Sequence, residues 1–229
     1  THAEESTSLP ITVTATRFAE PTASVLAPVN IITRKEIEQL HARSVTDVVK
    51  TLPGVEMVSN GGRGQQSSVL VRGTTSAETL VLMDGVRINS ATNGATDFSS
   101  IPLNQVERIE FVRGARASVY GSDAIGGVIQ LFTKKGEGAP APYVGVGLGN
   151  QGTRTAQAGI SGGAGALDYA LGLSHERADG FNSRPGAGNN PDKDGYRRSS
   201  GNAKLGLQIN PGQRLEGTLL GIKGQYRDD

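Results

Sequence analysis

Four scarcities limit what this chain of 229 residues can be. It has no cysteine, which excludes disulfide frameworks, thiolate zinc sites and cysteine nucleophiles. No apolar run reaches the about 18 residues that a membrane helix needs, so a membrane role would require strands. The chain has no large excess of charge of either sign, since 23 Lys and Arg balance 22 Asp and Glu. No nucleic-acid partner is therefore expected. Aromatic residues make up only 4%, and Trp is absent.

Glycine, by contrast, is abundant, with 32 residues. This content favours turns, bulges and close-packed strands over long helices. The first nine residues are mostly Thr, Ser, His and Glu, which offer little to bury, so residues 1–9 are expected to form a mobile tail.

Residues 30–52 have a helical pattern. Thr33 and Glu36 stand at the spacing of a capping box, in which each side chain accepts a hydrogen bond from the other residue's backbone. Ser44 is the expected N-cap of a second helix over 45–52, which Pro53 ends.

Short β-prone runs separated by Gly-rich turns follow from residue 55 to residue 133. They cover 69–71, 80–83, 106–112 and 128–132. Helices followed by such runs predict a small α+β domain. The composition changes at 134–142, where KKGEG leads into APAP, and we expect a domain boundary there, near Gly136.

Beyond this boundary the hydrophobic period becomes two, which is typical of strands with one apolar face. Five runs show it: 144–149, 155–161, 167–174, 202–209 and, less regularly, 215–222. The connectors 162–166 and 210–213 are short, whereas 178–195 is long and polar. This alternation is typical of outer-membrane barrels. A soluble antiparallel sandwich has the same period, so periodicity leaves both architectures open.

The first domain carries several motifs that resemble, in order, the plug of TonB-dependent outer-membrane transporters. They are 11–15 (ITVTA), 44–49 (SVTDVV), 52–55 (LPGV), 71–73 (VRG), 81–86 (VLMDGV), 106–110 (VERIE), 113–121 (RGARASVYG) and 124–129 (AIGGVI). Within this family the chain is most similar to the cobalamin receptors, through 14–18 (TATRF), 25–28 (VLAP), 60–68 (NGGRGQQSS) and 120–128 (YGSDAIGGV).

The resemblance implies an α+β plug domain inside a transmembrane antiparallel β-barrel of about 22 strands, a size that leaves a wide lumen to block. The implied division is a tail (1–9), a TonB box (9–15), a plug (16–136) and the first barrel strands (137–229). Five strands cannot close a barrel, so we expect further strands beyond this sequence. The expected setting is the outer membrane of a Gram-negative bacterium, with its lipid as a partner.

The resemblance also implies a function without covalent chemistry. Cobalamin or a related corrinoid would bind outside, and TonB would deliver energy by pulling on the box. No covalently bound cofactor is expected. The charged residues within the plug are expected to form ion pairs that hold it in a polar lumen. These are Arg72, Arg108, Arg113, Arg116, Asp84, Glu107 and Glu110.

The implied TonB box needs a mobile, extended segment whose backbone can add to a partner's sheet. Pro10 suits this need, because it cannot continue a helix. An ordinary edge strand of the plug is the alternative. The box residues are Leu9, Pro10, Ile11, Thr12, Val13, Thr14 and Ala15.

Two polar loops, 60–68 and 89–96, correspond to the plug loops that contact cobalamin in the resembling receptors. Their amide and hydroxyl groups suit a ligand rich in amides. The alternative is that these residues serve only the turns themselves. The expected ligand contacts are Asn60, Gln66, Ser68, Thr75, Thr92, Asn93 and Gly94.

The long loop spaces Asp192 and Asp194 two residues apart before a glycine, which suits a hard cation with oxygen ligands. The resemblance also implies a calcium-ordered loop here. The expected ligands are Asn182, Asn190, Asp192 and Asp194. A solvated polar loop is the alternative.

Enzymes are the rival class. The sequence contains no GxSxG, Walker A or HExxH motif, and His2, His41 and His175 have no ligand-type spacing. We therefore expect no enzyme. Two further classes stay open: a siderophore or heme receptor of the same family, and a signalling or adhesion protein that does not transport.

Overall fold

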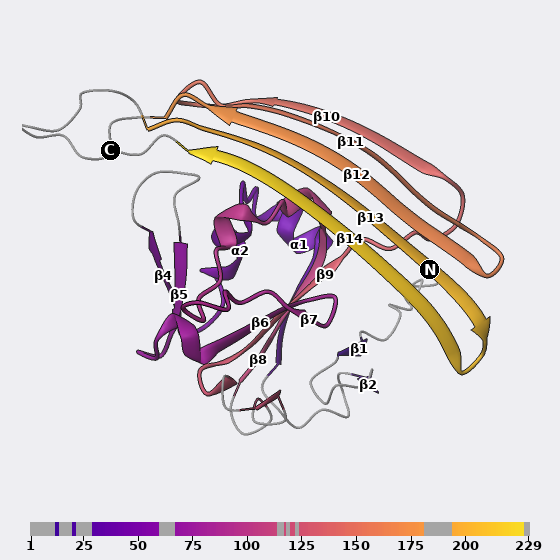
Figure 1. Ribbon diagram of the computed structural model, residues 1–229, viewed down its shortest axis with the longest axis horizontal. Helices are drawn as coiled ribbons and strands as arrows, with labels where there is room; N and C mark the ends of the chain where they lie inside the picture. Colours follow the sequence, from indigo (N-terminus) through magenta and orange to yellow (C-terminus); the bar gives the residue numbers. More distant parts are fainter. Residues whose placement is uncertain are drawn as a thin grey trace, which may run out of the picture.

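Two sheets of five strands dominate the fold (Figure 1). The structure is a computed structural model that describes residues 12–13, 20–21, 29–59, 67–113, 117, 120–121, 124–180 and 194–226. The N-terminal elements are β1 (Thr12–Val13), β2 (Glu20–Pro21), β3 (Val29–Thr33), α1 (Arg34–Gln39), α2 (Val45–Val49), β4 (Val55–Ser59), β5 (Ser67–Val71), η2 (Ser76–Glu78), β6 (Thr79–Met83), β7 (Val86–Arg87), η3 (Phe98–Ser100), η4 (Leu103–Gln105), β8 (Val106–Val112) and β9 (Gly127–Thr133). The later strands are β10 (Ala141–Leu148), β11 (Arg154–Ala164), β12 (Leu167–Ala178), β13 (Tyr196–Asn210) and β14 (Gln213–Tyr226).

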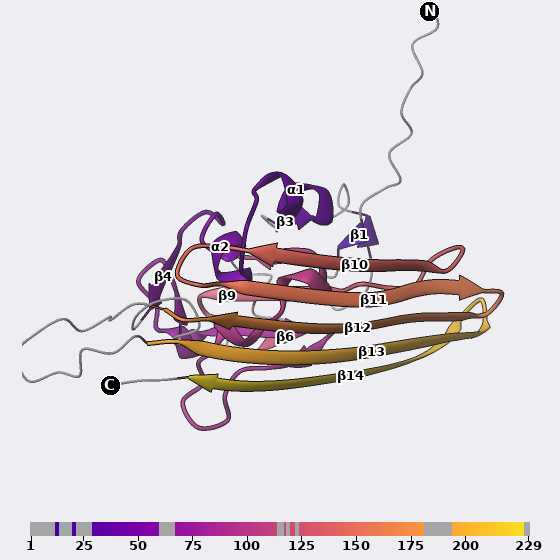
Figure 2. The same ribbon diagram turned by 90° about the horizontal axis from the view of Figure 1, so that it is seen from above.

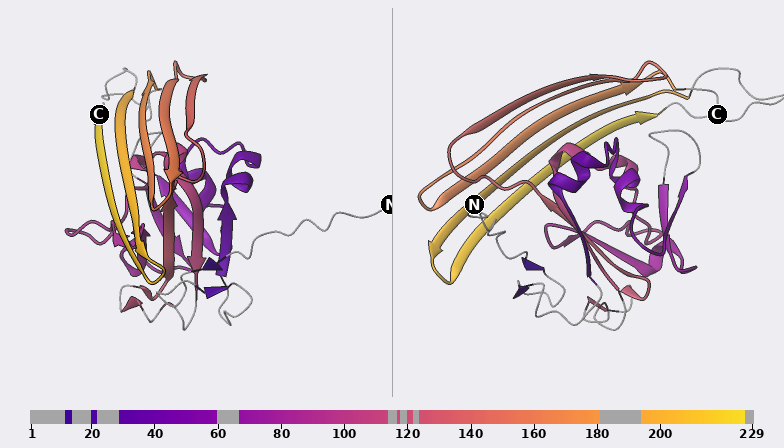
Figure 3. Two further views of the ribbon diagram at one scale, coloured as in Figure 1. Left: turned by 90° about the vertical axis from the view of Figure 1, so that its right-hand side faces the viewer. Right: turned by 180° about the vertical axis from the view of Figure 1, so that it is seen from behind.

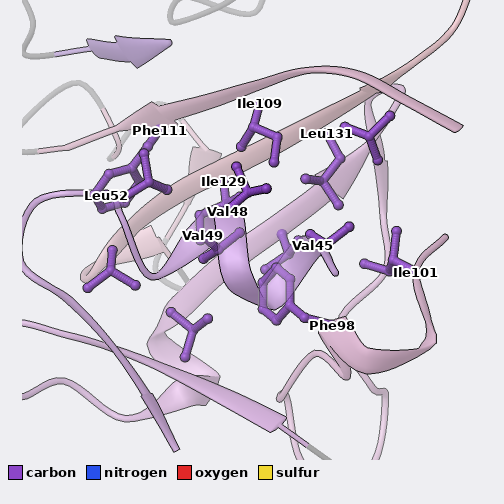
Figure 4. Close-up of a cluster of buried hydrophobic side chains, with 14 of the residues drawn as sticks. Val45, Val48, Val49, Leu52, Phe98, Ile101, Ile109, Phe111, Ile129 and Leu131 are labelled. Atoms are coloured by element: carbon purple, nitrogen blue, oxygen red, sulfur yellow. The ribbon is translucent and has the colours of Figure 1, made fainter. Parts of the chain in front are cut away.

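The first sheet has the strand order β3-β8-β9-β6-β7 and belongs to the N-terminal unit, residues 29–133. Its β6 and β9 are parallel, whereas the other neighbours are antiparallel. The helices pack against one face of this sheet and share its core (Figure 4). The labelled core side chains are Val45, Val48, Val49, Leu52, Phe98, Ile101, Ile109, Phe111, Ile129 and Leu131. The α+β prediction is confirmed.

Strand β6 is buried on both faces, which explains the uninterrupted apolar sequence LVLM that follows Thr79. Val81 and Met83 join the core beneath the helices. Leu80 and Leu82 belong to a second cluster, together with Val128 of β9.

The capping box at Thr33 and Glu36 is confirmed, and Ser44 caps α2 as expected. Two boundaries were wrong. The second helix ends at Val49 rather than at residue 52. Residues 30–32, expected to be helical, belong to β3, because their backbone pairs with β8 and the strand sequence VNIIT is rich in β-branched residues.

The second sheet is an antiparallel meander, β10-β11-β12-β13-β14, that curves over the N-terminal unit (Figures 1 and 3). Its strands lie side by side in chain order (Figure 2). All five predicted strands are present and each is longer than predicted, although β10 ends one residue before its predicted end at 149. The turns at 165–166 and 211–212 lie at one end, and the long connection 179–195 lies at the other.

The polarity of the two faces of this curved sheet is the reverse of that in a soluble protein, where the exposed face is polar and the covered face apolar. The face turned away from the N-terminal unit exposes apolar side chains, such as Val146 (86% exposed) and Leu173 (68%). The face turned toward the unit carries charged residues, including Glu176, Arg198 and Lys204. An apolar outside and a polar inside is the pattern of a membrane barrel, not of a sandwich.

No helix among the described residues has the length and apolar character to cross a membrane.

Candidate functional site

The N-terminal unit meets the curved sheet in a buried ionic cluster around Lys204, whose side chain is 1% exposed. Its ammonium lies 2.9 Å from the Asp84 carboxylate and 3.1 Å from that of Glu216 on β14. It also donates to the Thr133 hydroxyl at 3.2 Å, and that hydroxyl in turn donates to Asp84. The cluster therefore joins β13 and β14 to the turn after β6 and to the end of β9.

The backbone holds Asp84 in place for this contact. Asp84 has a positive φ of 47° in the turn between β6 and β7. Its own N–H donates to the carbonyl of Leu131, and its carboxylate accepts the backbone N–H of Thr133 at 3.0 Å. The carboxylate is thus oriented before Lys204 reaches it.

A second polar contact lies nearer the long connection. Arg198 of β13 donates to the carbonyl of Ser99 in η3 and pairs with Glu176 of β12 at 2.8 Å. The Tyr196 hydroxyl donates to the same carboxylate. Besides these contacts, Leu220 of β14 packs against the core of the N-terminal unit. The interface is therefore mostly polar, and water can replace such contacts when the parts move.

The chain leaves the N-terminal unit through a close backbone contact at Gly136. A Cβ there would lie 2.1 Å from the carbonyl oxygens of both Gly162 and Tyr169. Only glycine fits such an approach. Gly138 then accepts a hydrogen bond from the N–H of Gly163 at 2.7 Å.

The expected ion pairs of the N-terminal unit have mixed outcomes. Arg108 pairs with Glu110 at 2.9 Å, but both lie on β8, so this pair does not hold the N-terminal unit to the curved sheet. Asp84 is paired too, but its partner is Lys204 on the curved sheet. Arg113 instead hydrogen-bonds to the Asn30 side chain and the Pro53 carbonyl. Arg116 lies outside the described residues.

The loop 89–96, one of the two expected ligand loops, is fixed by the side chain of Asn89. Its amide oxygen accepts the N–H of Val81 at 2.8 Å. Its amide nitrogen donates to the carbonyls of Thr79 (2.9 Å) and Gly94 (2.8 Å). The side chain thereby extends the edge of β6 and anchors the loop that follows.

Within this loop the expected contacts Thr92, Asn93 and Gly94 take part in the turn. The Asn93 amide oxygen accepts the N–H of Ala95, and the N–H of Thr92 donates to the Ser90 hydroxyl. Gly94 has a positive φ of 70°. The side chains of Thr92 and Asn93 are exposed, so they can also meet a ligand.

Thr75 lies in a neighbouring segment. A Cβ on Gly94 would lie 2.8 Å from the Cβ of Ala77, so the loop touches η2. The backbone N–H and hydroxyl of Thr75 donate to Glu78 at 2.7 and 2.9 Å. These two hydrogen bonds lower the pKa of the exposed Glu78 carboxyl. The structure thus places Gly94 against η2, the short helix whose N-cap is Thr75.

The remaining expected ligand residues are only partly described. Ser68 lies on β5, half-buried and opposite Val58 of β4. Asn60 and Gln66 lie outside the described residues. Ser68 is not linked by any described contact to Thr75 or to residues 92–94.

Most of the expected TonB box also lies outside the described residues. The box residues concerned are Leu9, Pro10, Ile11, Thr14 and Ala15. Thr12 and Val13 form β1 and pair with Pro21 and Glu20 of β2. These two residues are extended, which both the box and the edge-strand alternative require. The box therefore stays a prediction.

The calcium site stays a prediction as well. Of its four expected ligands, Asn182, Asn190 and Asp192 lie outside the described residues. Only Asp194 is described, and no group of three or more metal-ligating side chains forms within the described part of the chain. The described residues alone do not make a calcium site.

The structural roles of Lys204 and Asn89 were not predicted from the sequence. Lys204 could have been noticed, because it occupies the polar face of the alternating run 202–209 and a lone cation there needs a partner. Asn89 had no such signal, since an Asn after a Gly-rich turn is ordinary.

Replacing Asn89 with Ala is expected to loosen the loop 89–96. Three hydrogen bonds are lost, at a local cost of about 2–3 kcal/mol. The amide of Val81 should exchange with solvent faster, as measured by hydrogen exchange in the complete protein. Asn93→Ala, which removes one bond within the loop, is the matched control. Unchanged protection of Val81 in Asn89→Ala would contradict the anchoring role.

Comparison with known proteins agrees with this architecture. The family model described as "TonB-dependent Receptor Plug Domain" matches residues 21–128. The chain is 41% identical, over 99% of its length, to the "Vitamin B12 transporter BtuB" of Photobacterium profundum, and covers 36% of that protein. It is 46% identical, over 86% of its length, to the transporter of the same name from Vibrio cholerae (strain O395), and covers 32% of it.

Among solved structures, the ferric enterobactin receptor PfeA of Pseudomonas aeruginosa matches with a TM-score of 0.70 and 25% identity, over 93% of this chain and 34% of that one. The chain thus spans about a third of the length of the relatives it matches. The relatives are transporters and receptors, not enzymes. Residues 21–128 are a plug domain, β10–β14 are barrel strands, and the chain belongs to the TonB-dependent receptor family.

Proposed function

We propose that the receptor containing this chain takes up cobalamin across the outer membrane of a Gram-negative bacterium. The observation that carries the proposal is the 41% identity to a vitamin B12 transporter along 99% of the chain. Ligand would bind on the outward plug loops and on the barrel. TonB would supply energy through residues 9–15.

The geometry of the loop 89–96 supports a ligand role. Asn89 holds its backbone by three hydrogen bonds, so the loop is preorganised and loses little entropy on binding. The exposed hydroxyl and amide of Thr92 and Asn93 suit the amide groups of a corrinoid. Thr75 is the N-cap of η2, the short helix that Gly94 touches.

The polar junction supports a plug that can move. Lys204 and Arg198 hold the plug to the barrel wall through ionic and hydrogen-bonded contacts. A pull on the N-terminal segment would exchange these contacts for water one by one, which an apolar interface of the same area would resist more strongly.

A siderophore receptor is the second candidate, because the ferric enterobactin receptor shares this fold at a TM-score of 0.70. The lower identity of 25% makes it the weaker one.

Equilibrium binding to the complete receptor in detergent separates the two candidates. We expect cobalamin to bind at least about 100-fold more tightly than ferric enterobactin, since unmatched buried polar groups reject a wrong ligand strongly. Exchanging Thr92 and Asn93 for Ala should weaken cobalamin binding. Ser100→Ala, on the plug outside this loop, is the control. Tight binding of ferric enterobactin without binding of cobalamin would overturn the proposal.

A further inference from the structure

Three arginines stand in a row across the barrel wall at the end where the long connection lies. Arg154 of β11 is directly opposite Arg177 of β12, and Arg177 is directly opposite Arg197 of β13. All three are exposed. Like charges at directly opposed positions destabilise a sheet. The stability of the sheet therefore does not explain this row.

The charge of the row is only partly balanced. Asp179 pairs with Arg177 at 3.4 Å, and both side chains are 51% exposed. Within the described part of the chain, Arg154 and Arg197 form no ion pair. Lys223 of β14, opposite Ser199, adds a fourth cation beside the row. Among the described residues of this face, four cations therefore share one carboxylate.

The row lies on the outer face of the wall, away from the plug. Alternation puts Arg177 on the same face as Leu173, which is 68% exposed, and Arg154 opposite Leu148, which is 89% exposed. The inward neighbours Glu176 and Arg198 pair with each other on the plug side instead.

Below the row the same face becomes apolar. His175 and Ser199, joined by a 2.9 Å hydrogen bond, come next, and then four cross-strand rows of small and apolar residues follow. The large apolar members of these rows are Ile160, Leu167, Leu171, Leu173, Leu205, Leu207, Leu215 and Leu219. The four rows extend about 20 Å along the strands. That is close to the height of about 25 Å expected for a lipid-facing band.

We propose that Arg154, Arg177 and Arg197 bind the phosphate groups of a phosphorylated lipid in the outer leaflet of the membrane. Guanidinium groups bind phosphate through paired hydrogen bonds. Adjacent strands lie about 5 Å apart, so the row offers phosphate contacts over about 10 Å.

Two further features favour a lipid over a soluble anion. Only the row of His175 and Ser199 separates the arginines from the apolar band, so a headgroup bound here has its acyl chains beside leucine and isoleucine. A hollow of about 730 Å³ lies at the same end of the strands, lined by Arg177, Arg197 and Gln225 of the outer face and by Ala178, Tyr196 and Tyr226 of the plug-facing side, and it leaves room for a headgroup at the rim of the wall. The inference rests on the proposed placement of these strands in the outer membrane.

The test uses the complete receptor in detergent and native mass spectrometry. The probe is lipid A with two phosphates. The triple variant Arg154→Gln, Arg177→Gln, Arg197→Gln should bind it about 100-fold more weakly, because each basic residue near an anionic lipid contributes about fivefold. The charge-keeping triple Lys variant should lose less than about tenfold. The plug double variant Lys35→Gln, Lys50→Gln is the matched control and should bind as wild type does.

Three results would overturn the proposal: wild-type affinity in the triple Gln variant, an equal loss in the plug control, or displacement of lipid A by equimolar inorganic phosphate. Dephosphorylated lipid A should bind as weakly to wild type as lipid A does to the triple Gln variant. Insertion into phosphatidylcholine vesicles is measured separately. Failure of the receptor to insert would contradict the proposed membrane function. Insertion without binding of lipid A would contradict only the proposal that the arginine row binds lipid phosphates.

Discussion

Replacing Lys204 with Ala is expected to destabilise the contact between plug and wall by about 3–5 kcal/mol, the cost of leaving a buried charge without its partner. Lys204 is 1% exposed and Asp84 7%, so as long as the plug stays against the wall the Asp84 carboxylate is left buried without the ammonium. Glu216 loses the same partner. Guanidinium unfolding of the complete receptor measures the loss, and hydrogen exchange at the amide of Thr133 localises it.

Lys50→Ala is the matched control for this prediction. Lys50 pairs with Asp47 at 2.8 Å, close to the distance between Lys204 and Asp84, but its side chain is 55% exposed. An exposed pair of this kind contributes less than about 1 kcal/mol. If both substitutions have the same small effect, burial does not strengthen the contact at Lys204.

The double variant Asp84→Asn, Lys204→Met separates the charge pair from its packing. Removing both charges should cost less than the sum of the single variants, because neither buried group is then left unpaired. In this variant Thr133 can still donate a hydrogen bond to the side-chain oxygen of the new Asn at position 84. It does so only if that residue keeps its positive φ in the turn between β6 and β7. Additive effects would mean that the two charges do not interact in the folded receptor.

Deleting residues 9–15 is expected to abolish uptake while ligand binding is unchanged. A partner that adds a strand to an extended segment gains its affinity from backbone hydrogen bonds, and these vanish with the segment. The candidate ligand residues Thr75, Thr92 and Asn93 lie on the plug beyond it and keep their contacts. Labelled cobalamin measures both properties, by accumulation in cells and by equilibrium binding to isolated outer membranes.

Deletion of residues 1–7 is the control for the box and should leave uptake intact. Uptake that survives the loss of 9–15 would assign the energy-coupling segment elsewhere. Loss of binding together with uptake would instead indicate that β1 and β2 support the plug fold, as the edge-strand alternative requires.

Much of the N-terminal unit was predictable from local chemistry. The capping box at Thr33 and Glu36 depends on residues three apart, and the structure confirms it. The run 80–83 is apolar because both of its faces are buried. Residues 30–32 were misjudged, because their pairing with β8 joins segments far apart in the chain, and no local pattern reports that pairing.

In the curved sheet, too, local features were predictable and the contacts between distant residues were not. Alternation predicted five strands, but it could not say which face meets water, because a sandwich and a barrel share the period of two. The structure decides this through the side that Lys204, Glu176 and Arg198 occupy, next to the plug. The opposite face keeps its leucines exposed.

The sequence by itself determined the five strands of the curved sheet, the helix caps and the family, since these depend on local order and on motifs that stand in sequence. Only the tertiary structure decided the partners: Lys204 with Asp84, Asn89 with the edge of β6, and the arginine row across β11, β12 and β13. The physical reason is register. Strand pairing fixes which distant residues lie opposite a charged or amide side chain, and so decides its partner. A shift of the register by one residue would turn each side chain to the other face of the sheet.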